Sequence, residues 1–319
     1  MTPRSIAQFI AVVLIWSTSW IMIKFQLGDV NPSWSVAYRF AVGGSALMIW
    51  CLLKGIPLHV PRHGWGFLMA FGLFQFVLNF NFVYRAELYI PSGLLAVAFA
   101  LLMVPNAILA RIWLGTRVSR RFLVGSALGI AGVFMLFAQQ LSLPDARDAA
   151  LIGLGLTAAG VMSASVANVM QATAKARSLP PLAGLGWAML MGAAMNAVIA
   201  FTVAGPPQWD ARPEYLAGLL ALGLLASAVA FALYFDLIRT IGPAEAAWTG
   251  VPIPIVAMLI STFVEGWVWT LLSLGGSTLA LIGLIVALRQ PGPNQGKVQA
   301  VPELRNPAIR RPVVEKNLP

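Results

Sequence analysis

Long stretches of apolar residues without charge dominate this chain of 319 residues. A stretch at 30–53 is interrupted only by Arg39, and nine runs of at least 19 residues hold no Asp, Glu, Lys or Arg: 5–23, 64–84, 88–110, 122–144, 149–174, 178–209, 215–235, 246–264 and 266–288. An apolar helix of roughly 20 residues crosses the hydrocarbon core of a bilayer and satisfies its own backbone hydrogen bonds there. The pattern predicts an all-α polytopic membrane protein with ten transmembrane helices.

Composition leaves little room for a soluble domain. Hydrophobic residues make up 59% of the chain and charged residues 10%, whereas about a quarter of the residues in a soluble domain are charged. Only 290–319, rich in proline and of mixed charge, is expected to be a disordered tail. The first run could pass for a signal peptide, but no small-residue cleavage site follows it before Lys24, so we expect it to be the first helix. The single Cys51 cannot form an internal disulfide.

The net charge of +10 reflects membrane topology and does not indicate a nucleic-acid partner. If the N-terminus is cytoplasmic, the inner connections carry eleven Lys and Arg residues and the tail five more, against four on the outer connections. The outer connections also carry seven acids: Asp29, Glu87, Asp145, Asp148, Asp210, Glu214 and Glu265. By the positive-inside rule, both termini are predicted to be cytoplasmic.

The two halves of the chain look like copies of one another. Pro91 and Pro243 open the fourth and ninth runs at an offset of 152, and Gly125 and Gly132 recur at an offset of 151 as Gly276 and Gly283. We predict a first five-helix repeat at 1–139, a periplasmic linker at 140–150, a second repeat at 151–289 and a cytoplasmic tail at 290–319. Because five is odd, the second copy must be inverted. Inverted repeats are typical of alternating-access carriers, which bind substrate near the midplane.

Three segments carry a resemblance to a known family. "LIWSTSWIMIK" places Lys24 eight residues after Trp16, "NPSWSVAYRFAVGG" runs from Pro32 to Arg39, and "ALYFDLIRTIGPAEAAW" joins the eighth run to the ninth. Over residues 5–289 the chain resembles the EamA-type exporters of the drug/metabolite transporter superfamily. Within that family it is similar to the YddG-type bacterial exporters of aromatic amino acids.

The resemblance implies a multi-pass transporter of the bacterial inner membrane, acting on small molecules by alternating access around a central cavity. Two positions depart from the commoner pattern of the family. Ser17 stands where glycine usually follows the tryptophan, and Leu114 stands where the first half would carry the glutamate that Glu265 supplies in the second half.

Polar side chains recur on one face of two predicted helices. Gln75, Asn79 and Phe82 share a face in the third helix, and Asn168 and Gln171 share one in the sixth. Amide groups facing lipid are costly to desolvate, so these faces should point into the bundle or a wet cavity. We predict that these residues bind substrate; hydrogen bonds between helices, worth about 1 kcal/mol each, are the alternative.

Aromatic side chains well inside the runs, or at the junctions between the repeats, are further candidates for the substrate site. They are Trp16, Trp20, Trp187, Tyr234 and Trp248, whereas the remaining tryptophans lie at the ends of runs, where an interfacial belt is expected. A cavity walled by such rings and a few amides would accept a flat or apolar side chain by stacking. Ordinary packing is the alternative for each ring.

Two cations are candidates for gating or for steering charge. Arg39 lies about two turns inside its span, where an unpaired cation would cost several kcal/mol, so it either steers an anion or ties helices together. Lys24, near the outer end, could attract a carboxylate or serve as an interfacial anchor. No Asp or Glu lies at mid-depth in a run, so the sequence offers no obvious proton relay and leaves facilitated, gradient-driven export open.

Prolines supply candidate hinges. Pro105 in the fourth helix, and Pro252 with Pro254 in the ninth, remove backbone hydrogen bonds at matching places in the two copies. We predict that the two copies rock about these kinks around the central cavity.

The inventory of side chains argues against an enzyme. His59 and His63 have the i, i+4 spacing of a metal pair, but they flank Pro61 in a short loop and no Cys or acid joins them. No HExxH, GxSxG or P-loop motif occurs. We therefore expect no enzyme activity, metal or cofactor, but a monomeric or homodimeric exporter of aromatic and other apolar amino acids. The alternatives are a drug, sugar-nucleotide or other metabolite carrier, a polytopic enzyme, or a channel.

Overall fold

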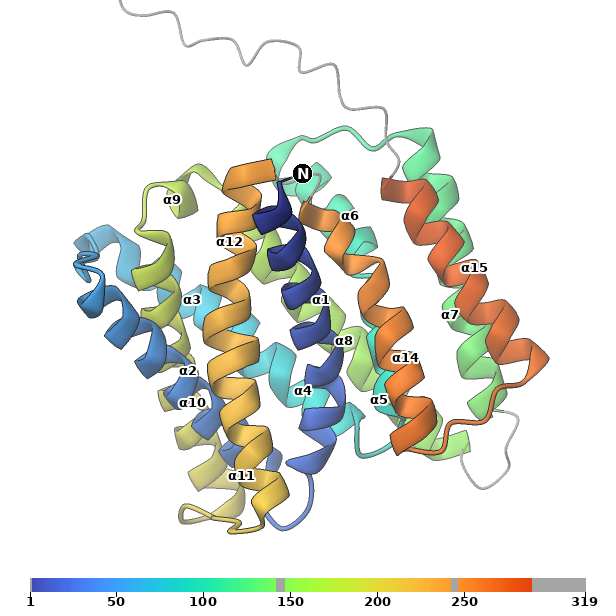
Figure 1. The fold of residues 1–319 in the computed structure, drawn as a ribbon, viewed down its shortest axis with the longest axis horizontal. Coiled ribbons are helices and arrows are strands. Elements are labelled where there is room, and N and C mark those ends of the chain that lie inside the picture. The colour runs from blue at the N-terminus through green and yellow to red at the C-terminus, as the bar shows by residue number, and fades with distance from the viewer. Residues whose placement is uncertain (1, 142–146, 242–245, 289–319) are drawn as a thin grey trace, which may run out of the picture.

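The computed structural model describes residues 2–141, 147–241 and 246–288, and its regular structure within these ranges is helical (Figure 1). The first half contains α1 (Pro3–Phe25), α2 (Pro32–Leu53), η1 (Arg62–Gly64), α3 (Trp65–Gly72), η2 (Leu73–Leu78), α4 (Asn79–Ala86), α5 (Ser92–Ala100), α6 (Met103–Leu114) and α7 (Arg120–Leu141). The second half contains α8 (Arg147–Gln171), α9 (Ala174–Arg177), α10 (Pro181–Ala204), α11 (Pro213–Leu220), η4 (Ala221–Val229), α12 (Ala230–Ile241), η5 (Ala247–Gly250), α14 (Pro252–Val264) and α15 (Leu271–Leu288).

Nine helical stretches in the described ranges are long and apolar enough to cross a bilayer, and Trp248–Val264 forms a shorter apolar helix. The prediction of a polytopic α-helical membrane protein is confirmed, with nine such stretches and one shorter apolar helix in the described ranges. Pro243, on which part of the repeat pattern rests, and the predicted tail at 290–319 lie outside the described residues.

Prolines and polar caps set where several helices begin. Thr2 caps α1 by accepting a hydrogen bond from the Ser5 amide at 3.2 Å, and Asn31 caps α2 through the Ser33 amide at 3.0 Å. Proline occupies one of the first helical positions of α1, α2, α10, α11 and α14. Its missing amide costs nothing there, because the first amides of a helix have no partner within the helix.

The predicted mid-helix kinks are breaks between separate helices. Proline cannot donate to the carbonyl four residues earlier, which is Leu101 for Pro105 and Trp248 for Pro252. In both places the residue just before the proline donates instead: Val104 to Leu101 at 2.8 Å and Val251 to Trp248 at 3.2 Å. The fourth span therefore divides into α5 and α6, and the ninth into η5 and α14. The same tight turn occurs in both halves.

Helices of the first half pack against their counterparts in the second. α2 packs on α10, α5 on α14 and α7 on α15, while α1 contacts η4 and α12, and α4 contacts α8. In Figure 1, α7 and α15 lie side by side at one edge of the bundle, and α2, α3 and α10 lie at the other. The start of α1 and the end of α15 are at the same end of the molecule, whereas α8 begins at the opposite end.

The closest of these pairs, α7 with α15, depends on glycine. A Cβ added to Gly132 would lie 2.5 Å from the Gly276 carbonyl oxygen, and one added to Gly125 would lie 2.5 Å from that of Gly283. The small-residue face predicted from the sequence therefore meets its counterpart in the other half. Here the two backbones touch with no side chain between them, as in other close helix pairs in membranes.

Replacing Gly132 by alanine tests this contact. Because the added methyl group must push two backbones apart, we expect Gly132→Ala to destabilise the protein by about 1–3 kcal/mol, as overpacking does elsewhere. Thermal unfolding in detergent measures the effect. The matched control is Gly155→Ala in α8, where an added Cβ meets nothing within 4 Å; equal loss in both variants would contradict this account of the helix pair.

Candidate functional site

A cavity of about 460 Å³ lies between the two halves. Pockets for small organic ligands have volumes of roughly 300–1,000 Å³, so a molecule the size of an amino acid fits. Its lining includes Arg39, Pro254 and six of the ten residues predicted to bind substrate: Trp16, Trp20, Gln75, Asn79, Asn168 and Tyr234. The lining residues run from Ile23 and Val83 to Leu288, the last residue of α15, at the end of the bundle where the chain begins.

Aromatic rings form one wall of this cavity. The Trp16 ring lies 5.4 Å from Phe231 and 5.1 Å from Tyr234, and its indole N–H donates to the Ala226 carbonyl at 3.2 Å. The Trp20 ring lies 5.2 Å from Phe99. Tilted rings at such separations attract one another and hold flat apolar surfaces in fixed orientations. These rings therefore form a wall of flat apolar surfaces along the cavity.

Polar groups without partners line the cavity beside these rings. The side-chain oxygens of Gln75, Asn79 and Asn106 are buried and accept no hydrogen bond. Buried polar atoms are nearly always hydrogen-bonded, and an unpaired one costs about 1–3 kcal/mol. Three residues of the cavity wall therefore carry an acceptor oxygen that no described group of the protein satisfies.

Arg39 supplies the matching donor. Its side chain is only 4% exposed, its Nε donates to the Ser227 hydroxyl at 3.3 Å, and its guanidinium carbon lies 4.4 Å from the centre of the Phe80 ring. Its Nη1 has no hydrogen-bond partner. Contacts with the ring and the hydroxyl hold the cation in place, while an unused N–H group leaves it able to bind an anion.

Four of the predicted binding residues do not line the cavity. Phe82 faces α8, where its Cβ is 3.4 Å from the position a Gly160 Cβ would take, and Gln171 is exposed at the end of α8. Trp187 donates to the Leu58 carbonyl at 3.0 Å and packs edge-on against another ring at the helix end. Trp248 is half-buried in η5 and does not line the cavity, whereas the following residues Thr249 and Gly250 do.

A π-helix explains the error at Phe82. η2 is a π-helical segment, which has more residues per turn than an α-helix and so rotates Gln75 relative to Asn79. The face of the cavity then continues through Phe80 and Val83. The eighth span has a π-helix in the same place, η4. A regular helical repeat cannot predict such a change of register.

Sequence reasoning also missed lining residues that carry no distinctive signal. Phe80, Phe99 and Phe231 are ordinary core residues by pattern, and Thr249 lies in a short 3₁₀ segment. Asn106 could have been found, because it is an amide inside a charge-free run next to a proline. Among the predicted hinge residues, Pro254 lines the cavity. Pro105, in the first turn of α6, and Pro252, at the start of α14, do not line it.

The opposite end of the bundle is held together by partly buried polar contacts, with the Lys24 side chain 37% exposed. Lys24 donates to the Glu87 backbone carbonyl at 2.6 Å and lies 3.9 Å from Glu265 Oε1. Glu265 accepts hydrogen bonds from the amide and hydroxyl of Ser92, at 3.0 and 2.5 Å, and from the Ser261 hydroxyl at 2.6 Å. These contacts tie α1, the end of α4, the start of α5 and the end of α14 together. We call this group of residues the outer seal.

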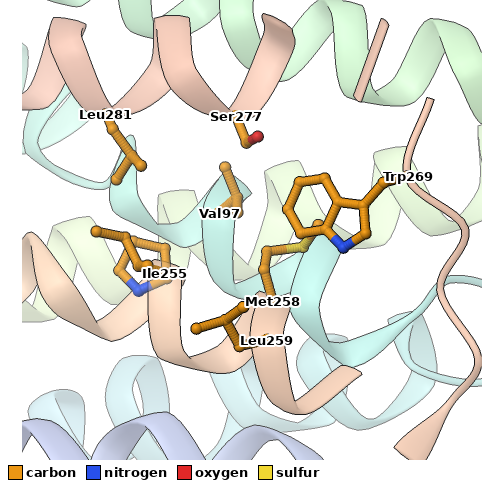
Figure 2. Close-up of a pocket in the computed structure, with 8 residues that line it drawn as sticks. Val97, Ile255, Met258, Leu259, Trp269, Ser277 and Leu281 are labelled. Carbon is orange, nitrogen blue, oxygen red and sulfur yellow. The ribbon is translucent and has the colours of Figure 1, made fainter. Parts of the chain in front are cut away.

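A second, smaller pocket lies between α5, α14 and α15 (Figure 2). Its volume is about 70 Å³, and it is lined mainly by apolar side chains such as Val97, Ile255 and Leu281. A cavity that holds benzene measures about 150 Å³, so this space is too small for a substrate. Pro254 borders both pockets, which leaves free volume on two sides of the start of α14. Within the described residues, no group of three His, Cys, Asp or Glu side chains could hold a metal ion.

The fold and cavity define a polytopic α-helical membrane protein with an internal cavity. The model of the EamA-like transporter family matches residues 4–138 and again residues 151–289. The chain therefore belongs to the EamA-like transporter family, and its two halves each match that model. It is a transporter, not an enzyme.

Relatives extend across most of the chain. The uncharacterized inner membrane transporter YedA of Escherichia coli K12 is 28% identical, over 85% of this chain and 83% of the relative. The uncharacterized transporter YoaV of Bacillus subtilis 168 is 20% identical, over 81% and 86%. A solved crystal structure that shares 20% identity superposes with a TM-score of 0.65 over 90% of this chain and 98% of that one, which supports the fold. Together with the nine apolar helices, these relatives make the chain a multi-pass inner-membrane protein.

Removing Glu265 tests the contribution of the outer seal to stability. Glu265→Ala leaves Lys24 without its ion pair and the Ser92 amide without its acceptor. Hydrogen bonds to charged groups contribute about 1.5–3 kcal/mol each, so we expect a loss of at least that size. Unfolding by SDS in mixed micelles, followed by tryptophan fluorescence, measures it. Glu214→Ala, at an exposed acid of α11, should leave stability unchanged; equal stability of both variants would contradict the proposed role.

Proposed function

We propose that the protein exports zwitterionic amino acids with aromatic or other apolar side chains. The observation that carries this proposal is the pairing of one cation and three acceptor oxygens, all without full partners, beside an aromatic wall in a single cavity. The Arg39 guanidinium suits a carboxylate, for which an N–H group is free. The oxygens of Gln75, Asn79 and Asn106 suit an ammonium group, and the rings suit the side chain.

Charge distinguishes this proposal from the other cargoes. Of the described residues that line the cavity, Arg39 is the one with a charged side chain. A sugar nucleotide carries a diphosphate, which would call for several cations or a metal ion. A zwitterion brings no net charge, so one cation with several neutral acceptors suits it better. The names of the relatives do not state a cargo.

We further infer that the two halves form an inverted repeat that works by alternating access. The match of the family model to each half supports this, as do the pairing of counterpart helices and the opposite ends at which α1 and α8 begin. If the termini are cytoplasmic, as the positive-inside rule predicts, the cavity extends toward the cytoplasm and the outer seal is closed. Such a state is ready to take up cargo from the cell.

The role of Arg39 is tested by comparing substrates that differ in one charge. In liposomes containing the purified protein, we expect tryptophan to be transported faster than tryptophan amide, which lacks the carboxylate. In Arg39→Gln this preference should fall about tenfold or more, because a charge-assisted hydrogen bond contributes about 1.5–3 kcal/mol. Flux of radiolabelled substrate under counterflow measures both variants.

The control for that assay is Arg147→Gln, at an exposed arginine at the start of α8, which should keep the preference of the wild type. Phenylalanine and methionine extend the test to other apolar side chains. Transport of a neutral sugar or a sugar nucleotide in preference to all three amino acids would overturn the proposal.

The prolines test the proposed rocking motion. Replacing Pro252 and Pro254 together by alanine lets Val251 and the preceding turn continue as regular helix, so we expect tryptophan flux to slow while expression and folding persist. Counterflow rates, normalised to the amount of folded protein, measure the change. Pro213→Ala, at the start of α11 and away from the cavity, is the matched control; unchanged flux in the double variant would remove the hinge.

A further inference from the structure

Glu87 stands out in the outer seal because its side chain has no partner. The residue is 0% exposed, and neither carboxylate oxygen takes part in a hydrogen bond with any part of the chain that the structure describes. It also caps the C-terminal end of α4, where its amide donates to the Val83 carbonyl at 3.1 Å. The negative end of the helix dipole disfavours an anion there. A buried carboxylate without donors is among the most costly groups in a protein, so the neutral acid is favoured.

Charged groups from three other elements face Glu87. Lys24 on α1 contacts its backbone carbonyl, yet the ammonium group is directed to Glu265, after α14, which has its own set of donors. Arg39 on α2 is held by Ser227 and Phe80, and Tyr84 on α4 itself donates to Gln26 at 2.6 Å. None of these groups makes a hydrogen bond to the Glu87 carboxyl.

The electrostatics agree with this geometry. Burial raises the pKa of the Glu87 carboxyl well above its usual value; Lys24 acts against this rise, Glu265 adds to it, and Arg39 again acts against it. Burial is the largest of these effects, and it lasts only while the outer seal excludes water. Any movement that lets water in removes the main reason for the carboxyl to stay neutral.

We propose that Glu87 is a proton-binding site within the outer seal, protonated while the seal is closed and deprotonated when it opens. The proposal rests on the alternating access inferred above. On opening, the O–H bond of the carboxyl breaks, the proton passes to water at the outer face, and the carboxylate can pair with Lys24. On closing, one proton is taken from the same face, so the cycle moves no net proton across the membrane.

The direction of the pH dependence follows from linkage. The pKa of Glu87 is higher in the closed state than in the open one, so the closed state binds more protons. Low outer pH therefore stabilises the closed seal, and rising pH favours opening. Between the pKa in the open state and that in the closed state, the open population should rise about tenfold for each pH unit, because opening then releases one proton; below both pKa values it should not change with pH.

The test measures opening without any substrate. Val83 lines the cavity one turn before Glu87 and is 2% exposed, so Val83→Cys reports access from the outer face once the buried native thiol is removed by Cys51→Ala. Spheroplasts, which expose only the outer face, are treated with a membrane-impermeant maleimide at a series of outer pH values. Rates are divided by those of Asp29→Cys, at an exposed position, to remove the pH dependence of the thiol itself.

We expect the normalised labelling of Val83→Cys to rise with pH when Glu87 is present and to be flat and low in Glu87→Gln. Glu87→Asp should retain the rise, and Glu214→Gln, at an exposed outer acid, should match the parent. If Glu87→Gln does not fold, Glu87→Asp is compared with the parent instead. We then expect the midpoint of the pH dependence of labelling to shift between these two proteins.

Two results would overturn the proposal. One is an identical pH profile in Glu87→Gln and the parent, and the other is absence of labelling at every pH in a protein that carries flux. Failure of the proposed cargo is a separate outcome: pH-dependent labelling without amino-acid flux would leave the proton site standing and remove the substrate assignment.

Discussion

A polar group inside a bilayer has no water to bond with, so another part of the protein or a ligand must satisfy it. This constraint divides the molecule into two regions. At the outer end, Lys24 and Glu265 meet, and Asn81 donates to the Asn196 side chain at 2.5 Å. In the cavity, Arg39 Nη1 and the Asn79 side-chain oxygen have no partner. Most polar groups at the closed end are satisfied, the Glu87 carboxyl being the main exception, whereas the unsatisfied groups of the cavity are where the proposed cargo would bind.

Regular patterns in the sequence predicted most of the fold because they follow from the same constraint. Charge-free runs had to become helices, and glycines at matching positions in the two halves had to let α7 and α15 touch. Amides at depth were expected to face inward, and Gln75, Asn79 and Asn168 do line the cavity. The positions of Trp16, Trp20 and Tyr234 on the cavity wall followed from their depth in the runs. Apart from the contact between α7 and α15, each of these features depends only on neighbours along one helix.

Features that depend on contacts between helices could not be predicted. The π-helix η2 changed which residues after Asn79 face the cavity, so Phe82 was assigned to the wrong face. Trp187 found an acceptor in a loop of the other half, which no periodicity reveals. Glu87 was counted simply as an outer acid, although it is fully buried. The position of a residue relative to the end of an apolar run can be read from the sequence. Whether a residue at such an end is buried depends on which other helices pack against it.

The polar contacts at the two ends of the bundle differ in strength. At the end where the chain begins, Arg4 pairs with Asp236 at 3.0 Å, with side chains 80% and 41% exposed, and such exposed pairs contribute little. Gln8 also donates to Asp236 there, at 2.6 Å. At the outer end, Glu265 is 11% exposed and accepts hydrogen bonds from Ser92 and Ser261, each worth about 1.5–3 kcal/mol. A difference of about 2.8 kcal/mol is a hundredfold ratio of populations. One or two such bonds therefore suffice to keep this end closed, under the alternating access and orientation proposed above.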